Sequence, residues 1–392
     1  MLNFTIKTPT EVVFGRGIEE KIGERIKEYG AHRVLVHFGG ASARSSGLLD
    51  LVERSLFDAG LSFVELGGVS PNPKISLVRK GVALCRREGL DFVLAVGGGS
   101  VIDSAKAIAM GAATGRDPWE FASTGTRPDK TLPVATVLTL AASGSETSNS
   151  CVLTNEETKE KRGITSETNR PVISFLDPEN TFTVSKFQTG CGIVDIMMHT
   201  LERYLTPEGG ESDLTDRIAE GLLIAVRDAG RRAIADPRDY EARATLMWAG
   251  SVSHNDYTGC GRKRLFPVHK LEHELSAFRD EIAHGAGLSV LFPAWAEHEM
   301  PYDYPRFAQF ANRVLGVEMD FEHPERTARE GIRTLRRFFE EIGMPTHLSQ
   351  LGIKPENYEK LAANTVRTVN GPVKSYSPLD EKAIIEIYRL AE

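Results

Sequence analysis

The sequence predicts an α/β N-terminal domain, a parallel sheet with helices on both faces, followed by an all-helical C-terminal domain. Short apolar runs alternate with helical stretches in the first half, as in parallel sheets joined by crossover helices. The strand runs are almost continuously apolar, which is typical of a sheet covered on both faces. After Thr181 strand-like runs become rare. The chain of 392 residues is long enough for two domains, which we place at residues 1–180 and 181–392.

The N-terminal half supplies the elements of this sheet in order. Apolar runs of strand length predict β-strands, and the longer stretches between them predict helices. The predicted strands are residues 33–38, 61–66, 91–96 and 134–138. The predicted helices are residues 48–59, 75–88 and 101–111, and then 214–232 and 325–342 in the second half.

Composition and charge limit the function classes. The chain is 41% hydrophobic and 26% charged, as in ordinary globular proteins, and its net charge of −7 argues against nucleic acid or an anionic membrane as main partner. The first residues do not resemble a signal peptide, and no apolar run reaches the length of a membrane span. The four cysteines are scattered without a Cys-x-x-Cys pair, which indicates free thiols. We therefore expect a cytoplasmic protein with no membrane or nucleic-acid partner.

A glycine run stands between a predicted strand and a predicted helix. Gly97-Gly98-Gly99 lack side chains, so the backbone can approach a diphosphate at the helix N-terminus, and Ser100 can cap that helix. The run is neither Gly-x-Gly-x-x-Gly nor a Walker loop. The alternative interpretation is a tight structural turn between strand and helix.

A second polar loop, residues 139–147, follows the predicted strand 134–138. Its hydroxyls and small residues suit contact with a cofactor ribose or nicotinamide at the carboxyl edge of the sheet. The alternative is a Ser/Gly loop that caps the next helix.

Histidines cluster in the second half. Asp195 and His199 are four residues apart, as are His269 and His273, so each pair shares one face of a helix. Five of the ten histidines fall between positions 199 and 284. Such a set suits a borderline divalent metal such as iron(II) or zinc, although a single pair at this spacing also arises by chance.

Taken together, these features resemble the iron-containing (group III) alcohol dehydrogenases, in particular the butanol-dehydrogenase-like branch. The resemblance implies a dinucleotide-binding N-terminal domain, a helical metal- and substrate-binding domain, the dehydroquinate synthase-like architecture and a homodimer. The matching motifs span nearly the whole chain: Gly97-Gly98-Gly99-Ser100-x-x-Asp103-x-Ala105-Lys106, Ser143-Gly144-Ser145-Glu146, Leu176-Asp177-Pro178, Gly192-x-x-Asp195-x-x-x-His199-x-x-Glu202, and His269-x-x-x-His273 followed by His284-Gly285.

The resemblance also assigns roles by position. The implied metal ligands are Asp195, His199, His269 and His284, and His273 is implied as a catalytic residue near nicotinamide and substrate. The implied cofactor-binding residues are Gly97, Gly98, Gly99, Ser100 and Asp103 at the diphosphate and ribose, Thr139 and Ser143 beside the nicotinamide, and Lys161.

Two features depart from the family pattern. One extra residue precedes His284, which makes it the least certain ligand. The basic run Arg262-Lys263-Arg264 is also atypical, and we interpret it as surface rather than as a site for an acidic substrate.

The loop after the first predicted strand bears on cofactor choice. In the resembled family this loop lies near the adenosine ribose, and an Asp there commonly selects NAD. Here Gly39 and Gly40 leave space, Ser42 can donate a hydrogen bond, and Arg44 can pair with a 2′-phosphate. We therefore predict NADP(H) over NAD(H); the alternative is an ordinary Gly/Ser turn with a solvated arginine.

The predicted function is reversible hydride transfer between NAD(P)H and a small alcohol/aldehyde pair such as butanol and butanal. The divalent metal, iron(II) or zinc, acts as a Lewis acid on the substrate oxygen, and His273 offers a path for the proton. The alternatives are a glycerol-dehydrogenase-like or dehydroquinate-synthase-like enzyme on the same fold, and a non-catalytic sugar- or nucleotide-sensing module.

Overall fold

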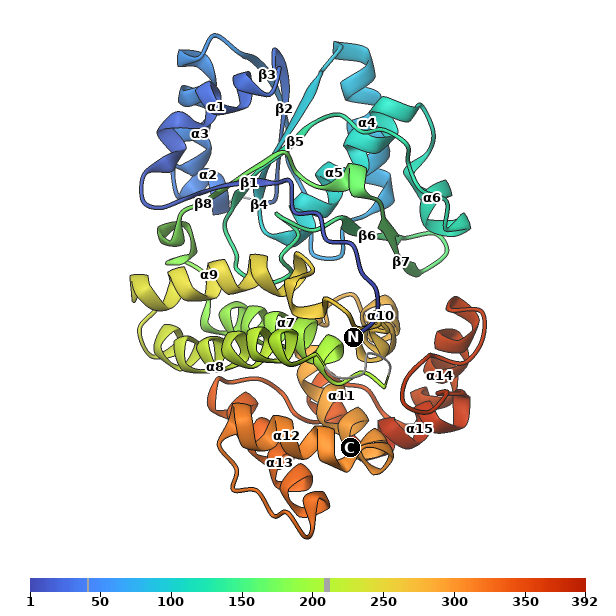
Figure 1. Ribbon diagram of the computed structural model, residues 1–392. Helices are drawn as coiled ribbons and strands as arrows, with labels where there is room; N and C mark the ends of the chain where they lie inside the picture. Colours follow the sequence, from blue (N-terminus) through green and yellow to red (C-terminus); the bar gives the residue numbers. More distant parts are fainter. Residues whose placement is uncertain (41, 208–211) are drawn as a thin grey trace. The chain divides into compact units, whose positions relative to one another are not determined.

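The computed structural model describes residues 1–40, 42–207 and 212–392 (Figure 1). These residues form two compact units, Lys7–Thr183 and Val184–Glu392, and the second unit also includes Met1–Ile6. The Leu2 N–H, for example, donates to the Gly261 carbonyl at 2.9 Å. The division into folding domains at residues 1–180 and 181–392 stays a prediction.

The described part of the first unit contains a parallel sheet of six strands, in the order β1-β8-β5-β4-β2-β3. The predicted parallel sheet is therefore confirmed. The strands are β1 (Glu11–Phe14), β2 (Arg33–Phe38), β3 (Ser62–Leu66), β4 (Phe92–Gly97), β5 (Val134–Leu138) and β8 (Ile173–Leu176). An antiparallel hairpin, β6 (Ser150–Asn155) and β7 (Glu160–Thr165), lies between β5 and β8 in the chain and was not predicted.

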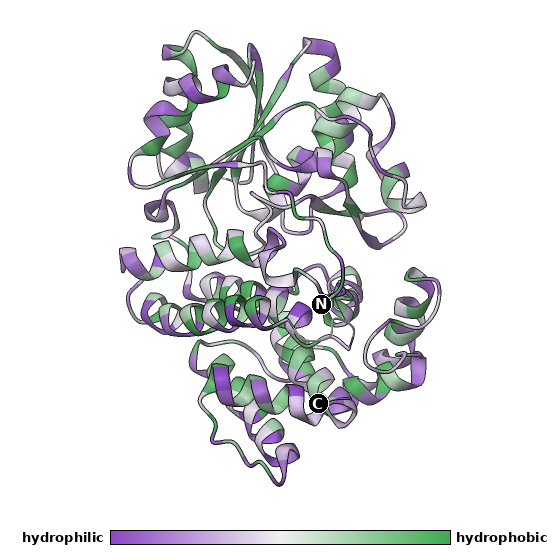
Figure 2. Ribbon diagram, in the orientation of Figure 1, coloured by the Kyte–Doolittle hydropathy of each residue, from purple (hydrophilic) through white to green (hydrophobic). Residues whose placement is uncertain are grey.

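Helices cover both faces of the sheet (Figure 1). On one face, Val34 and Leu94 belong to the same buried core as Leu49 and Val52 of α3. On the other face lie α4, α5 and α6, and the strands between the two helical layers are strongly hydrophobic (Figure 2). The helices are α1 (Ile22–Glu28), α2 (Ser42–Ser45), α3 (Leu48–Asp58), α4 (Ile75–Glu88), α5 (Gly99–Thr114) and α6 (Pro118–Thr124).

The helix after the glycine run begins earlier than predicted. Helix α5 starts at Gly99, and its N-cap is Gly98, in an extended conformation and without a side-chain cap. The prediction that Ser100 caps the helix is therefore wrong, because Ser100 already lies in the first turn. The loop at residues 139–147 runs into strand β6, so no helix follows it.

The order of the strands reverses between β2 and β4, because the chain passes from β2 to β3 on one side and returns to β4 on the other. In open α/β sheets, ligands bind beyond the carboxyl ends of the strands at such a point. Buried His37 joins the elements there: its Nδ1–H donates to the Leu66 carbonyl at 2.7 Å, and its Nε2 accepts from the Ser104 hydroxyl at 2.8 Å. Burial lowers the His37 pKa to about 4, so this link stays neutral.

The second unit is helical, as predicted. Among its described residues, the only β-pairing is an isolated bridge between Val373 and Leu379. The helices are α7 (Lys186–Tyr204), α8 (Asp213–Ala235), α9 (Tyr240–His254), α10 (Pro267–Phe278), α11 (His284–Glu299), α12 (Tyr304–Leu315), α13 (Pro324–Glu341), α14 (Tyr358–Thr368) and α15 (Glu381–Leu390). None of the described helices is long and apolar enough to cross a membrane.

Candidate functional site

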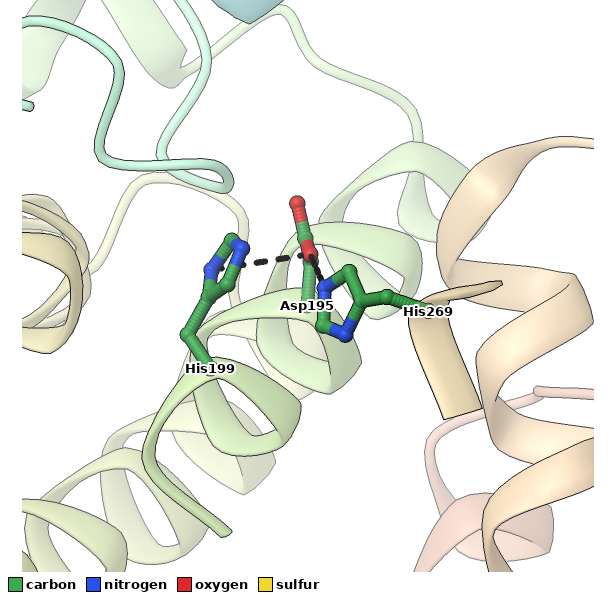
Figure 3. Close-up of side chains that lie close together, drawn as sticks. All are labelled: Asp195, His199 and His269. Carbon is green, nitrogen blue, oxygen red and sulfur yellow. Dashed lines mark ion pairs between the residues drawn. The ribbon is translucent and has the colours of Figure 1, made fainter. Parts of the chain in front are cut away.

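Helix α7 supplies the first pair of site residues. Ser185 caps the helix by accepting a hydrogen bond from the Gln188 N–H, and the helix is buried from Thr189 to its end. A spacing of four residues places Asp195 and His199 on one helical face. The His199 Nδ1 lies 3.7 Å from the Asp195 Oδ1, and both side chains are buried (Figure 3).

Two further histidines reach the same carboxylate oxygen. His269, in the first turn of α10, places its Nε2 at 3.7 Å from the Asp195 Oδ1 (Figure 3). His284, the first residue of α11, also places its Nε2 at 3.7 Å from that oxygen. The structure thus gathers all four predicted ligand residues around one point.

The extra residue expected before His284 falls in the loop between α10 and α11. Helix α10 ends at Phe278, and the Ile282 N–H closes a turn onto the Arg279 carbonyl at 3.0 Å. The Arg279 side chain donates to the Gly352 carbonyl at 3.0 Å. After this turn, α11 begins with His284 beside Asp195.

The Asp195 oxygen and the histidine nitrogens around it have a spacing that suits a divalent metal. Among the described residues, no hydrogen-bond partner serves the buried Asp195 Oδ1, His199 Nδ1 or His269 Nε2. Leaving buried polar atoms unpaired is costly, so a bound cation would explain all three. Ligand atoms about 2.1 Å from a tetrahedral metal lie roughly 3.4 Å apart, close to the spacing found here. One carboxylate with three imidazoles suits iron(II) or zinc.

Two buried glutamates orient the histidines. The His269 Nδ1–H donates to Glu202, and the His284 Nδ1–H donates to Glu272. These bonds turn both Nε2 atoms toward Asp195 and fix the tautomer, as carboxylates do behind metal-bound histidines. Burial alone would lower the His269 pKa, but Glu202 and Asp195 raise it to about 9.

Sequence reasoning assigned no role to either glutamate, although their spacing could have indicated one. Glu202 follows His199 by three residues, and Glu272 follows His269 by three. Each glutamate therefore shares a helical face with a predicted ligand.

His273 lies beside His284 rather than beside Asp195. The ring centroids of His273 and His284 are 5.7 Å apart, and both side chains are half-buried. Glu272, His273 and His284 form a second group whose potential ligand atoms all lie within 4.8 Å of one another. Two overlapping ligand sets therefore share His284.

The basic run at residues 262–264 was expected to be surface, and for Arg262 this is wrong. The Arg262 side chain is 5% exposed and pairs with the equally buried Asp216, which also binds Arg306. Arg264, more exposed, pairs with Asp256 at 2.6 Å. Arg262 therefore serves packing within the helical unit, whereas Lys263 and Arg264 are exposed, as expected.

In the first unit, the glycine run and the polar loop at residues 139–147 lie in contact. A Cβ on Gly99 would come within 2.2 Å of the Ser143 Oγ, and one on Gly98 within 3.1 Å of the Leu140 Cβ. The Thr139 N–H donates to the Gly97 carbonyl at 3.1 Å. The glycines are therefore needed for close approach of the two loops, and the structure brings Gly99 and Ser143 together.

The Asp103 carboxylate is hydrogen-bonded to other residues of the first unit. Its carboxylate accepts from the Ser145 hydroxyl at 2.6 Å and from the Val152 N–H at 2.9 Å. The buried Lys106 ammonium donates to the Ser145 carbonyl at 2.6 Å, which holds the same loop. Lys161, on β7, is also buried. Direct contact of Asp103 or Lys161 with a cofactor stays a prediction.

The Arg44 side chain is 48% exposed, but it is also paired with carboxylates. Its guanidinium, on α2, pairs with Glu65 of β3, lies 3.6 Å from Glu53 of α3, and stacks over the Phe38 ring at 5.6 Å. The loop that follows β2 contains no carboxylate, but α3 and β3 place the carboxylates of Glu53 and Glu65 beside Arg44. Ala41 of this loop lies outside the described residues. Arg44 therefore already has anionic partners with which a phosphate would compete.

Both halves of the chain match family models. Residues 9–178 match the iron-containing alcohol dehydrogenase model, and residues 189–391 match the C-terminal model of the Fe-containing alcohol dehydrogenase family. An NADH-dependent butanol dehydrogenase A from Clostridium acetobutylicum is 40% identical over 99% of both chains. An NADPH-dependent aldehyde reductase from Escherichia coli is 35% identical over 90% of both. The crystal structure of NADH-dependent butanol dehydrogenase A from Thermotoga maritima superposes with a TM-score of 0.95 at 38% identity, covering 100% of this chain and 99% of that one.

The orienting glutamates lead to a first prediction. We expect Glu202→Gln and Glu272→Gln each to weaken iron(II) or zinc binding about 10- to 100-fold, because the histidines lose a charged partner. Competition with a chromogenic chelator measures the affinity. Glu299→Gln is the matched control, since this buried carboxylate binds His298, Ser375 and Ser377, none of which is a proposed ligand. Unchanged affinity in both test variants would show that the glutamates do not support a metal.

Proposed function

This chain belongs to the iron-containing alcohol dehydrogenase family, and we propose that it interconverts short alcohols and aldehydes such as butanol and butanal at one divalent metal. It is an NAD(P)H-dependent alcohol dehydrogenase and aldehyde reductase, an oxidoreductase that acts on CH–OH groups. The observation that carries the metal-dependent mechanism is the set of three imidazole nitrogens, each 3.7 Å from the Asp195 Oδ1.

The proposed ligands of iron(II) or zinc are Asp195, His199, His269 and His284. A bound divalent metal supplies Lewis acidity to the substrate oxygen, and the nicotinamide carries the hydride. Glu202 and Glu272 keep the Nε2 atoms of His269 and His284 turned inward. We assign His273 to proton transfer: a ring nitrogen takes the alcohol proton during oxidation and returns it during reduction.

The remaining assignments concern the cofactor loops, location and assembly. We propose that the glycine run with Ser100 and Asp103 serves the diphosphate and ribose, and that Thr139, Ser143 and Lys161 lie near the nicotinamide. Contact between the Gly99 backbone and Ser143 supports placing these two loops at one cofactor. Location in the cytoplasm fits four cysteines that are all free. Assembly as a homodimer stays a prediction.

The proposed function predicts strict dependence on metal. Protein stripped by a chelator should not oxidise NADPH or NADH with butanal, and iron(II) or zinc should restore the activity. His199→Ala should lose both bound metal and activity, while the Lys7–Thr183 unit retains its nucleotide affinity. Metal analysis, nucleotide titration and the absorbance of the reduced nicotinamide measure these three properties. His323→Ala, at an exposed helix terminus, is the control. Full activity in a metal-free His199→Ala protein contradicts the proposal.

We also propose a preference for NADP(H) over NAD(H). Gly39 and Gly40 leave room at the loop, and Ser42 and Arg44 offer donors to a 2′-phosphate. The pairing of Arg44 with Glu65 acts against this preference, because a phosphate has to displace a carboxylate. The relatives differ in cofactor: the butanol dehydrogenases are named as NADH-dependent and the Escherichia coli aldehyde reductase as NADPH-dependent.

Paired variants test the role of Arg44. Loss of one charge-assisted contact should weaken NADPH binding about tenfold in Arg44→Ala and leave NADH unchanged. Glu65→Gln should strengthen NADPH binding, because it removes the carboxylate that competes for Arg44. Fluorescence titration of each cofactor gives the dissociation constants, with Arg54→Ala, exposed on α3, as control. Equal loss for both cofactors, or a wild-type protein that favours NADH, would show that this loop does not recognise the 2′-phosphate.

A further inference from the structure

The loop between β5 and β6 folds around the buried ammonium group of Lys106. This residue lies on α5, is 0% exposed, and has no part in the proposed mechanism. Its Nζ donates to the carbonyls of Ser145, Ser148 and Ser150 at 2.6, 3.0 and 2.9 Å. The hydroxyl oxygens of Ser145 and Ser148 lie 2.9 and 3.4 Å from the same nitrogen. Oxygen atoms of one short segment thus surround a single positive charge.

The carbonyls of this loop depend on side chains from outside it. The Ser174 hydroxyl donates to the Glu146 carbonyl at 2.6 Å, and Arg170 donates to the Thr147 carbonyl at 2.8 Å. Buried carbonyls need partners, and carbonyls that converge on one point repel one another unless a positive charge lies between them. Rings of carbonyl oxygens bind potassium ions in channel filters by the same attraction. The Lys106 ammonium therefore takes the place that a monovalent cation takes in such a ring.

The Ser145 hydroxyl links this charge to Asp103. An ammonium group only donates, so the Ser145 Oγ accepts from Lys106, and its own hydrogen points to the Asp103 Oδ1 at 2.6 Å. Asp103 and Lys106 are three residues apart and share one face of α5. Burial lowers the Lys106 pKa to about 8, whereas the charge of Asp103 raises it, so the ammonium form prevails at neutral pH.

The same segment connects Lys106 to the glycine run. The Ser145 N–H donates to the Ser143 Oγ at 3.3 Å, and a Cβ on Gly99 would lie 2.2 Å from that oxygen. Gly99 and Lys106 both belong to α5, so the helix contacts the loop at two points. Loss of the ammonium group would release Ser145, and the position of Ser143 against the glycine backbone would change with it.

We propose that Lys106 is a positioning residue for the cofactor: its ammonium group serves as a built-in monovalent cation that holds residues 143–150 against the glycine run. Ser143 is then presented in the geometry that the nicotinamide cofactor binds. This inference rests on the proposed function, in which Ser143 and the glycine run serve one cofactor. The Lys106 side chain has no exposed surface, so it acts through the loop and not by touching the cofactor.

Two replacements of Lys106 separate the charge from the volume. Lys106→Met fills the space without a charge, whereas Lys106→Ala removes the end of the side chain, which free propylammonium can replace. Both variants should weaken cofactor binding about tenfold, the value of one charge-assisted contact. Fluorescence titration with NADPH and NADH measures the affinity. Propylammonium should restore the affinity of Lys106→Ala in a saturable manner and should not change Lys106→Met, because methionine occupies the space.

Lys80→Ala, exposed on α4, is the control and should match the wild type with and without the amine. Tetramethylammonium, a cation without N–H groups, should restore nothing. Wild-type affinity in folded Lys106→Met, whatever its melting temperature, would show that Lys106 only stabilises the unit and would overturn the inference. A loss in Lys106→Ala that propylammonium does not reverse, or that tetramethylammonium reverses equally, would overturn it as well.

A further variant covers the case in which neither Lys106 variant folds. Ser145→Ala removes the hydroxyl link between Lys106 and Asp103 but keeps the Ser145 carbonyl at the ammonium group. It should weaken cofactor binding several-fold, and wild-type affinity in this variant would overturn the inference. If the wild-type protein binds neither NADPH nor NADH, the proposed function itself fails.

Discussion

The helical unit depends on one buried carboxylate, Asp195, whose Oδ1 has three imidazole nitrogens at the same distance of 3.7 Å. A carboxylate in the middle of a buried helix is unfavourable unless a positive charge compensates for it. The surrounding imidazoles can offer lone pairs to a metal, which at His269 has to displace the proton that the raised pKa favours. A divalent metal satisfies the carboxylate and the rings together, and the binding energy of such a metal contributes to folding.

The pairing around Asp195 links three helices in series. Glu202 of α7 binds His269 of α10, and Glu272 of α10 binds His284 of α11. Each of the three helices thus supplies a histidine that faces Asp195. Helices α7 and α10 also supply a carboxylate that orients the histidine of the next helix. Within this chain of contacts, Glu272 sets the orientation of the His284 ring.

Local periodicity predicted much of this structure, and contacts between distant elements account for the rest. Strand β2 was predicted with its observed bounds, and the spacing of four residues in α7 placed Asp195 and His199 together. Glu65 could not be assigned to Arg44, because the pairing depends on β3 lying beside β2 in the sheet. The His254 ring packs against His199 with ring centroids 4.1 Å apart, but it lies on a different helix from every predicted ligand, so no spacing in the sequence connects the two.

The most direct test of this account is anomalous diffraction from crystals grown with iron(II) or zinc, recorded at the absorption edge of the metal. The account predicts one strong peak in the helical unit, about 2.0–2.2 Å from Asp195, His199, His269 and His284. A peak held by Glu272, His273 and His284 instead would contradict the ligand assignment. Full aldehyde reductase activity of a protein whose crystals show no metal peak would contradict the role of the metal.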